Sequence, residues 1–560
     1  MKKQTITLSF LCSAILSAAP ISTGDILRQV EQPQMPVPEK ALPSVGTGEY
    51  KTPLSAKDDV KTFIKSFKFS GNTAFSSDVL STLVKPYENK ELGINGLKEV
   101  ASIITKYYRD NGYFVARAYI PAQGMETGIV EIAIIEGADG AFDIKNRSLV
   151  ETSEVQGFMD HLKGGERVST FSLERQMLLI NDLSGSQVTN AEVYPGKEVG
   201  TSDFRITVSP TQKYAGYAIA DNYGSRYTGE NRLSLGGYVN SISGIGDTLS
   251  ITGLISNTAD LKNIRLGYDR PLGYTGLKGG VSFSTTDYTL DEINNYEAYG
   301  RTNNFSGYIS YPTIKTRNHT QTLEASYDHK NMKDSSGVPG SVEESEKSLD
   351  ALTFKGSDRS NTSLLNLPGS LYGSLSMTLG HLGLKNDVAH ANDELGLDAG
   401  GNYAKANLNM IHNQYLIDNT NLQTTIKGQK SFGKNLDSAE DISVGGTNGV
   451  RAYEDSELSG DQGYALSLDL IYTLPKIDQI SHNTSLFLDH AKVWRNDTTF
   501  NSDDNIRTLN AVGVGYTLNY SSFNLKATYA HGFGDESTPT TEAEFTTSKN
   551  KFLIQGMMWF

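Results

Sequence analysis

The feature that most constrains the fold is an alternation of polar and apolar residues that continues to the C-terminus. Segments such as 248–255, 466–474 and 552–560 place an apolar side chain at every second position. Successive side chains of a strand point to opposite faces, so each segment predicts a strand with one apolar face. Lengths of roughly 9–11 residues suit tilted strands that cross lipid, whereas an aqueous sandwich does not need strands this long. The pattern therefore predicts a mostly β chain with an antiparallel transmembrane β-barrel over residues 210–560.

Composition agrees with a barrel and excludes two other classes of protein. The chain has 54 Gly, 29 Tyr and 21 Phe but 2 Trp, which suits many strands with aromatic girdles. Mean hydropathy is -0.37, which leaves no room for a bundle of helical spans of roughly 20 apolar residues each. A net charge of -14 argues against a nucleic-acid partner.

The connections between the predicted strands alternate in length. Counting back from the C-terminus, a long polar loop (534–550) is followed by a tight turn (519–522), a longer loop (495–506) and a short link (475–482). Outer-membrane barrels have short periplasmic turns and longer outside loops. The stretch 329–363, rich in Asp, Glu, Ser and Lys, is interpreted as another outside loop.

The length of this region sets the size of the barrel. Its 351 residues allow about 22 residues for each strand with its connection if the barrel has sixteen strands. Spacing alone leaves fourteen or eighteen strands open. The last strand keeps its alternation to Phe560, which is interpreted as a C-terminal assembly signal.

The N-terminus predicts export from the cytoplasm. Lys2 and Lys3 precede a short apolar stretch that ends in small residues, so residues 1–19 are interpreted as a secretory signal peptide. Pro20 leaves the cleavage site open. The only cysteine, Cys12, lies in this segment, so the mature chain would have no disulfide, thiolate nucleophile or Cys-ligated metal.

A short helix and a linker follow the signal peptide. Within residues 20–32, Ile26, Leu27 and Val30 have helical spacing, and the plain alternative is a frayed N-terminal helix. Residues 33–57 hold several prolines and are predicted to form an extended, partly stiff linker.

Two small α/β units are predicted between the linker and the barrel. Residues 58–137 read as strand, helix, helix, strand, strand, and residues 138–209 have a similar order, with helices near 151–162 and 171–183. This order indicates a tandem repeat, although two unrelated modules would look the same. Such small sheets leave edge strands available for pairing with an extended partner.

One loop and one strand carry the candidate site. The Gly-rich segment 445–454 holds Arg451 between Val450, Ala452 and Tyr453, and the strand count makes it the sixth outside loop. On the following strand, Phe487 and Asp489 alternate with leucines and are predicted to face the lumen. If the loop folds inward, a buried Arg451–Asp489 contact could hold it there. The alternative is an exposed arginine and an ordinary lumenal aspartate.

In this order, the motifs resemble the outer-membrane transporters of two-partner secretion, the TpsB proteins of the FhaC and ShlB type, in the superfamily that includes BamA. Residues 24–32 resemble the plug helix of that family, 66–137 its first POTRA domain, and 221–232 its first barrel hairpin. Residues 450–453 resemble its Val-Arg-Gly-Tyr loop motif and 487–489 its Phe-x-Asp wall motif. Ala stands where the loop motif has Gly, which would strain the loop if that position needs a positive φ.

The resemblance implies a sixteen-stranded barrel in the bacterial outer membrane, two periplasmic POTRA domains and a plug helix. It implies export, without ATP, of a large secreted partner such as a β-helical adhesin, cytolysin or contact-dependent toxin. The POTRA edges would bind the unfolded partner, the plug would leave, and the Arg451–Asp489 pair would hold or reset the loop. Other implied partners are outer-membrane lipid and the barrel assembly machinery, and the protein is expected to be a monomer without a cofactor.

Three other classes of protein fit the sequence less well. An assembly factor of the BamA type usually has more POTRA units than two. A porin or ligand receptor has no need of tandem periplasmic domains. An enzyme is not expected, because the chain has no Gly-x-Ser-x-Gly, His-Glu-x-x-His or Cys/His metal spacing. His490, beside Asp489, is interpreted as lumen lining rather than a catalytic base.

Overall fold

The fold is known from a computed structural model of the chain. It describes residues 23–30, 61–113, 116–136, 138–164, 169–195, 201–258, 260–293, 296–455, 457–499, 505–534 and 549–560. The predicted signal peptide and Pro-rich linker lie outside the described residues. Across the described ranges, no helix is both long enough and apolar enough to cross a membrane.

The first α/β unit is a three-stranded sheet of order β2-β5-β4 covered by two helices. Its elements are β1 (Thr62–Ile64), β2 (Ser66–Ser70), α2 (Ser77–Val84), η2 (Lys85–Tyr87), β3 (Lys90–Leu92), α3 (Ile94–Asp110), β4 (Arg117–Tyr119) and β5 (Ile129–Ile135). Helix α3 packs on the sheet because Leu97, Val100, Ala101 and Ile104 repeat at helical spacing and are buried. The β1–β3 pair was not predicted from the sequence.

The second unit repeats this topology. Its elements are β6 (Ala138–Asn146), α4 (Thr152–Asp160), η3 (His161–Gly164), α5 (Thr170–Asn181), β7 (Ser186–Pro195) and β8 (Thr201–Pro210). The sheet order is β6-β8-β7. In both three-stranded sheets the first strand in chain order (β2 or β6) pairs parallel with the last (β5 or β8), and the second (β4 or β7) pairs antiparallel with the last.

The rest of the chain is a closed barrel of sixteen strands, all of whose neighbouring pairs are antiparallel, as predicted. The strands are β9 (Tyr214–Asp221), β10 (Arg232–Asn240), β11 (Thr248–Ser256), β12 (Leu261–Pro271), β13 (Lys278–Ile293), β14 (Tyr296–Lys315), β15 (His319–Val338), β16 (Ser341–Leu364), β17 (Leu367–Leu384), β18 (Gly401–Ile417), β19 (Thr420–Ser431), β22 (Gln462–Thr473), β23 (Ile480–Trp494), β24 (Ile506–Tyr520), β25 (Phe523–Gly532) and β26 (Asn550–Trp559). A helix, α6 (Asp387–Leu395), follows β17. The loop after β19 holds η4 (Ser438–Glu440), β20 (Ile442–Ser443) and β21 (Ser459–Gly460).

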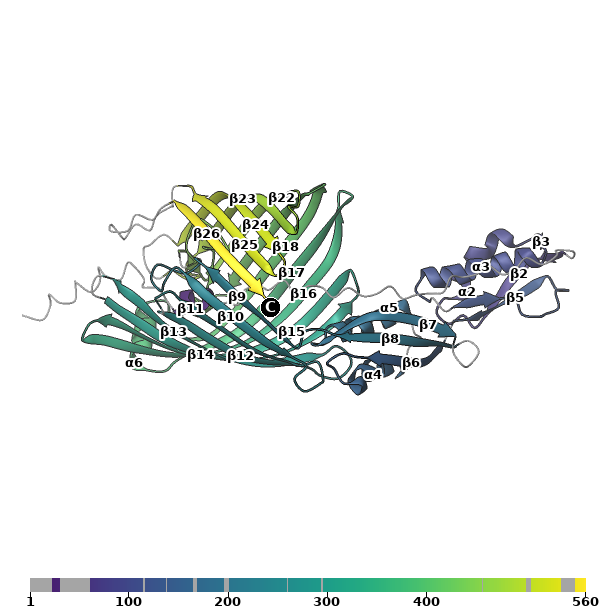
Figure 1. The fold of residues 1–560 in the computed structure, drawn as a ribbon, viewed down its shortest axis with the longest axis horizontal. Helices are drawn as coiled ribbons and strands as arrows, with labels where there is room; N and C mark the ends of the chain where they lie inside the picture. The colour runs from purple at the N-terminus through teal and green to yellow at the C-terminus, as the bar shows by residue number, and fades with distance from the viewer. Residues whose placement is uncertain are drawn as a thin grey trace, which may run out of the picture.

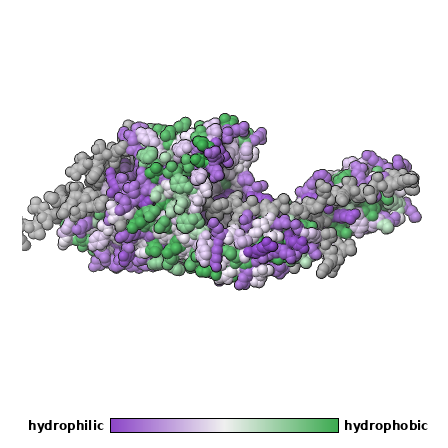
Figure 2. Space-filling model, viewed as in Figure 1, coloured by the Kyte–Doolittle hydropathy of each residue, from purple (hydrophilic) through white to green (hydrophobic). Residues whose placement is uncertain are grey.

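The alternation in sequence becomes an inside and an outside face. On β11, Ile251 is 51% exposed on the outer face, whereas Thr252 is 6% exposed and faces inward. Figure 2 shows hydrophobic residues gathered on the barrel wall, while the small units carry more hydrophilic surface. The outer face is therefore built to contact lipid.

The stretch 329–363 is not a loop, so this part of the prediction was wrong. Strands β15 and β16 stay paired from His319↔Ser360 to Val338↔Ser341, with a tight turn between them. Polar residues are stable in this hairpin because the backbone is paired and the side chains pair across strands, as Lys333 does with Glu346. The hairpin extends the wall beyond the length that lipid alone requires.

The second unit rests on the short turns of the barrel (Figure 1). Lys315 forms an ion pair with Asp182 at 2.9 Å, and Arg317 forms one with Glu174 at 2.5 Å. The Glu151 amide donates to the Gly244 carbonyl at 2.7 Å. These contacts place the second α/β unit at the end of the barrel that carries the short turns.

Candidate functional site inside the barrel

The loop between β19 and β22 folds into the barrel. Its two arms bond to each other, because the Val444 amide donates to the Leu458 carbonyl at 3.0 Å and the Val450 amide to the Val444 carbonyl at 2.8 Å. Gly446 has a φ of 69°, a conformation that favours glycine, and its amide donates to the Tyr453 carbonyl. This compact turn aims Arg451 at the barrel wall.

Arg451 meets Asp489, the residue that the sequence placed on the lumenal face. Arg451 Nε donates to Asp489 Oδ2 at 2.9 Å, and Nη2 donates to Oδ1 at 2.7 Å. The backbone amide of Arg451 also donates to Asp489 Oδ2, at 3.1 Å. Asp489 is 0% exposed and Arg451 is 8% exposed. We call this bidentate, desolvated contact the Arg451–Asp489 clasp.

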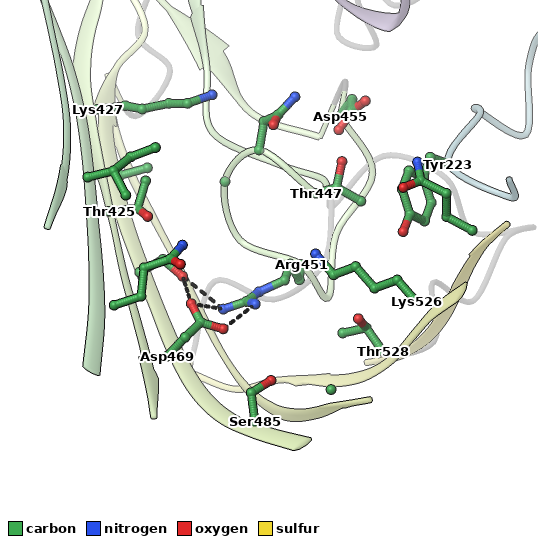
Figure 3. A pocket seen from close by; sticks show the side chains of 18 of the residues that line it. Tyr223, Thr425, Lys427, Thr447, Arg451, Asp455, Asp469, Ser485, Lys526 and Thr528 are labelled. Atoms are coloured by element: carbon green, nitrogen blue, oxygen red, sulfur yellow. Dashed lines mark hydrogen bonds and ion pairs between the residues drawn. The ribbon is translucent and has the colours of Figure 1, made fainter. Parts of the chain in front are cut away.

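A second carboxylate joins the clasp, and sequence reasoning did not single it out as a partner. Arg451 Nη1 donates to Asp469 Oδ1 at 2.7 Å, and Nη2 donates to the Ser467 hydroxyl at 2.8 Å. Figure 3 shows Arg451 reaching from the loop to Asp469 on the wall. A signal was present, because Ser467 and Asp469 alternate with leucines on the strand that pairs with the one bearing Asp489.

Phe487 completes the seat of the guanidinium group. Its ring centroid lies 3.5 Å from the central carbon of the Arg451 guanidinium, a stacked cation–π contact. Gly513, on the neighbouring strand β24, leaves room for the ring, since a Cβ there would lie 2.3 Å from Phe487 Cζ. Phe487 is buried and faces the lumen.

The other motif residues pack the loop against the wall. Val450, Ala452 and Tyr453 are buried in one apolar cluster with Ala511 and Ala530 of the barrel. The positive-φ residues of the described chain do not include Ala452. The position therefore does not need glycine for its backbone angle, and alanine causes no strain of the kind considered above.

Helix α1 (Thr23–Gln29) lies inside the barrel, where Figure 1 draws it in purple. Ile26 is 0% exposed and packs with wall residues from β12, β13 and β14. Those residues are Leu261, Tyr288, Leu290 and Ala298. Val30 packs on the edge of this cluster, whereas Leu27 is only partly buried.

Both ends of α1 are hydrogen-bonded to the barrel. At the start, the Thr23 hydroxyl donates to Asp334 of β15. At the end, Arg232 of β10 donates to the Gln29 carbonyl at 2.9 Å, and the Thr228 hydroxyl donates to Gln29 Oε1 at 3.2 Å. The helix therefore bridges the lumen between distant strands.

A cavity of about 570 Å³ lies between the loop, the wall and the end of α1. Its lining includes Gln29, Thr447, Lys427 and Lys526, and Figure 3 shows the two lysines on opposite sides of Arg451. Loop and helix thus fill much of the lumen and leave an aqueous space beside them.

The barrel closes between β26 and β9 through five residue pairs, from Asp221↔Gln555 to Tyr217↔Trp559. Phe560 extends this closure, because its amide donates to the Gly216 carbonyl at 3.0 Å and the Gly216 amide donates to the Phe560 carbonyl at 2.8 Å. The Phe560 side chain is 63% exposed. Its interpretation as an assembly signal stays a prediction.

His490 does not line the lumen, so that expectation was wrong. It shares the outer face of β23 with Leu486 and Leu488, because adjacent residues of a strand point to opposite sides. Its ring nitrogens bond Tyr464 and Asn510. Among the residues that the structure describes, no group of three or more His, Cys, Asp or Glu could hold a metal ion.

In the first α/β unit, Glu136 is a buried carboxylate at the end of β5. It accepts hydrogen bonds from the amides of Thr73 and Ala74 at 2.5 and 2.7 Å and from the Tyr108 hydroxyl at 2.8 Å. Burial raises the pKa of Glu136, but these hydrogen bonds outweigh it and hold the pKa below its usual range. The charged carboxylate therefore joins the turn after β2 to helix α3.

Replacing Glu136 with Gln should loosen this turn at neutral pH. Because the folded pKa is lowered, the stabilisation is present above the unfolded pKa of about 4.3 and is lost as pH falls through the folded pKa. Lost hydrogen bonds to a charged group cost about 1.5–3 kcal/mol each. Hydrogen exchange of the amides at 73–74 in the full chain should be faster in Glu136→Gln than in the exposed-site control Glu126→Gln. Equal rates in the two variants would show that the carboxylate does not hold the turn.

A closed outer-membrane-type barrel with α/β units at its short-turn end and an inward loop defines the class of POTRA-barrel proteins. Residues 200–518 match the family described as haemolysin secretion/activation protein ShlB/FhaC/HecB, and residues 62–137 match the POTRA domain, ShlB-type. The chain belongs to this ShlB/FhaC/HecB family of two-partner secretion transporters. The barrel therefore lies in the outer membrane and the POTRA region in the periplasm, as the resemblance implied.

Individual relatives agree with this assignment. The chain is 28% identical over 523 residues to the heme/hemopexin transporter protein HuxB of Haemophilus influenzae (strain 86-028NP), covering 92% of this chain and 91% of the relative. It is 25% identical to the outer membrane transporter CdiB of Escherichia coli O6:K15:H31, covering 85% and 82%. Two solved structures share the fold: CdiB from Escherichia coli (TM-score 0.74, 19% identity, 93% and 94% covered) and CdiB from Acinetobacter baumannii (0.65, 15%, 93% and 95%).

Proposed function

We propose that this transporter exports one large secreted partner protein of β-helical type, an adhesin, cytolysin or contact-dependent toxin. The observation that carries the proposal is a lumen occupied by α1 and the Arg451 loop, next to periplasmic sheets whose edge strands pair with no further strand in the described residues. Curated relatives are named as transporters of heme/hemopexin and of hemolysin. No ATP is needed, because folding of the partner outside makes its return unfavourable.

The periplasmic units supply the proposed receptor. We take residues 58–137 and 138–209 as two POTRA domains, because their sheets share one topology. Each sheet has an edge strand on either side, β2 and β4 in the first and β6 and β7 in the second. An unfolded partner could add to such an edge as an extended strand, with backbone hydrogen bonds giving affinity without a strict sequence requirement.

Inside the barrel, passage requires both occupants of the lumen to move. Helix α1 acts as a plug, and its departure opens the path beside the wall. The Arg451–Asp489 clasp holds the loop in place while the barrel is closed, and restores it after transport. The partner passes as an unfolded chain, the protein works as a monomer in outer-membrane lipid, and the barrel assembly machinery inserts it.

Two other functions are less favoured. The structure of a BamA from Haemophilus ducreyi is similar to this chain, with a TM-score of 0.51 and 16% sequence identity. At this level of identity the similarity shows a shared fold and not a shared role. An assembly role would need recognition of many unfolded barrels, whereas the match to the secretion family spans residues 200–518. We also propose no catalytic role and no cofactor, since the buried charges of the site are paired with one another.

Comparison of the culture supernatant and cell surface with and without the gene tests the proposal. We expect one very large protein to be lost from outside the cell and recovered when the gene is restored. An unchanged set of secreted proteins together with a broad fall in other outer-membrane barrels would contradict export and favour the assembly role.

A further inference from the structure

The first half of the inward loop carries a short acidic turn that none of the recognised motifs includes. We call residues 437–440, with η4, the acidic turn. Glu440 forms ion pairs with Lys330 of β15 and Lys405 of β18, each at 2.9 Å. Asp437 forms an ion pair with Lys347 of β16 at 2.7 Å. Three lysines from three strands thus converge on one turn of the loop.

The contacts of the acidic turn are those of an organised site. Glu440 and Asp437 are 5% and 6% exposed. The Glu440 carbonyl accepts from Lys405 Nζ at 2.6 Å and from Gln429 Nε2 at 2.8 Å. Asp437 Oδ1 accepts from the Ala439 amide at 3.0 Å and so caps η4. Each buried carboxylate therefore has a charged partner, the backbone carbonyl of Glu440 accepts two further bonds, and the Asp437 carboxylate also caps η4.

This anchor is separate from the Arg451–Asp489 clasp. The lysines come from β15, β16 and β18, whereas the clasp residues of the wall come from β22 and β23. The loop between β19 and β22 is therefore fixed to two different parts of the barrel wall. Breaking one anchor leaves the charges of the other paired.

Helix α1 sits directly on the acidic turn. A Cβ added to Gly24 would lie 1.9 Å from the Ser438 carbonyl oxygen, so the helix backbone and the turn are in close contact. The neighbouring Thr23 donates to Asp334 of β15, which also accepts from the Tyr288 hydroxyl at 2.6 Å. The start of the plug is thus bounded on one side by the turn and on the other by the wall.

We propose that the acidic turn is the seat of the plug helix, and that its lysine cluster positions the helix by fixing Ser438. This inference rests on the proposed role of α1 as a plug. The turn makes the helix dependent on the loop, because Gly24 packs against the backbone of η4 too closely to leave room for a side chain. When the Lys330–Glu440–Lys405 pairs separate, the loop start moves and the helix loses its support. Residues 437–440 are then positioning residues for closure of the channel.

Replacement of Glu440 by Gln tests this, because it keeps the shape of the side chain and removes the charge that two lysines share. The measurement is uptake of a bulky antibiotic that the closed outer membrane excludes, in cells without a secreted partner, so that the result does not depend on export. Loss of the carboxylate charge weakens the bonds to both lysines, so uptake should rise by about tenfold or more. Heat-shifted gel mobility gives the level of folded barrel, and the exposed Glu343→Gln on the β15–β16 hairpin is the matched control.

Two further variants separate seating from general damage. Gly24→Val disturbs the contact between Gly24 and Ser438 from the helix side and leaves all charges in place. It therefore tests the seating of the helix even if Glu440→Gln fails to fold. Deletion of residues 23–30 gives the uptake of a barrel without its plug. We expect Glu440→Gln to add nothing in that background. Unchanged uptake in both single variants, or a further rise from Glu440→Gln in the deleted background, would overturn the proposal.

Discussion

Replacing Arg451 with alanine is expected to leave an assembled barrel that has lost most of its export. The change removes the guanidinium group that donates two hydrogen bonds to Asp489, a carboxylate that is 0% exposed. Breaking a buried pair in this way costs about 3–5 kcal/mol, so the inward position of the loop would lose at least about a hundredfold in population. Secreted partner per folded barrel should fall by about tenfold or more if the loop must return after each passage.

The controls for Arg451→Ala come from the same part of the molecule. Arg495→Ala removes an exposed arginine just past the strand that bears Asp489 and should leave export unchanged. Arg451→Lys keeps the charge but cannot bond two carboxylates and stack on Phe487 together, so it should resemble alanine more than the native residue. Full export from Arg451→Ala at a normal level of folded barrel would remove the clasp from the mechanism.

The sequence predicted the parts of the fold that follow from a local period. Alternation at every second residue fixed which side of a strand meets lipid, and it placed Phe487 and Asp489 in the lumen. Sixteen strands were predicted from length, although spacing alone left fourteen or eighteen strands open. The number of strands is decided by closure of the barrel. It depends on pairings such as that of β9 with β26, which join the two ends of the barrel sequence.

The missed features depend on partners that are distant in sequence. The stretch 329–363 looks like a loop by composition, but its charged side chains pair across the β15–β16 hairpin and make a polar strand stable. Asp469 has the same alternation as many lumenal residues, and only the register of β22 with β23 brings it to Arg451. His490 was misplaced for a local reason, because its neighbour Asp489 faces the lumen and the next residue must face outward.

The contacts of α1 could not be read from sequence at all. Ile26 and Val30 predict a helix with one apolar side, which is also the pattern of a frayed terminus. The decisive contacts are to residues about 200 to 400 positions away, Arg232, Asp334 and Ser438. The residues of the helix do not by themselves specify these contacts. Each contact is made by one polar side chain or backbone group of the barrel, which comes near the helix only when the barrel is closed.

The second large effect is expected from Ile26→Asp. Ile26 is 0% exposed in an apolar cluster with Leu261 and Tyr288, so an aspartate there would be a buried, unpaired carboxylate. Such burial costs several kcal/mol and also removes the apolar contacts of Ile26, so the helix would be held only by the polar contacts of Thr23 and Gln29, at about 1–3 kcal/mol each. The helix should therefore leave the lumen, and antibiotic uptake should rise by about tenfold or more.

Export should persist in Ile26→Asp, because the plug has to leave the lumen before a partner can pass. Leu27→Asp is the matched control. Leu27 is only partly buried, so the carboxylate of an aspartate at this position could remain in water. Uptake should therefore rise less in Leu27→Asp at the same level of folded barrel. Equal uptake in Ile26→Asp and the native protein would mean that α1 does not close the channel. Loss of export together with raised uptake would mean that the channel is open but cannot transport the partner protein. The helix would then be needed during transport itself.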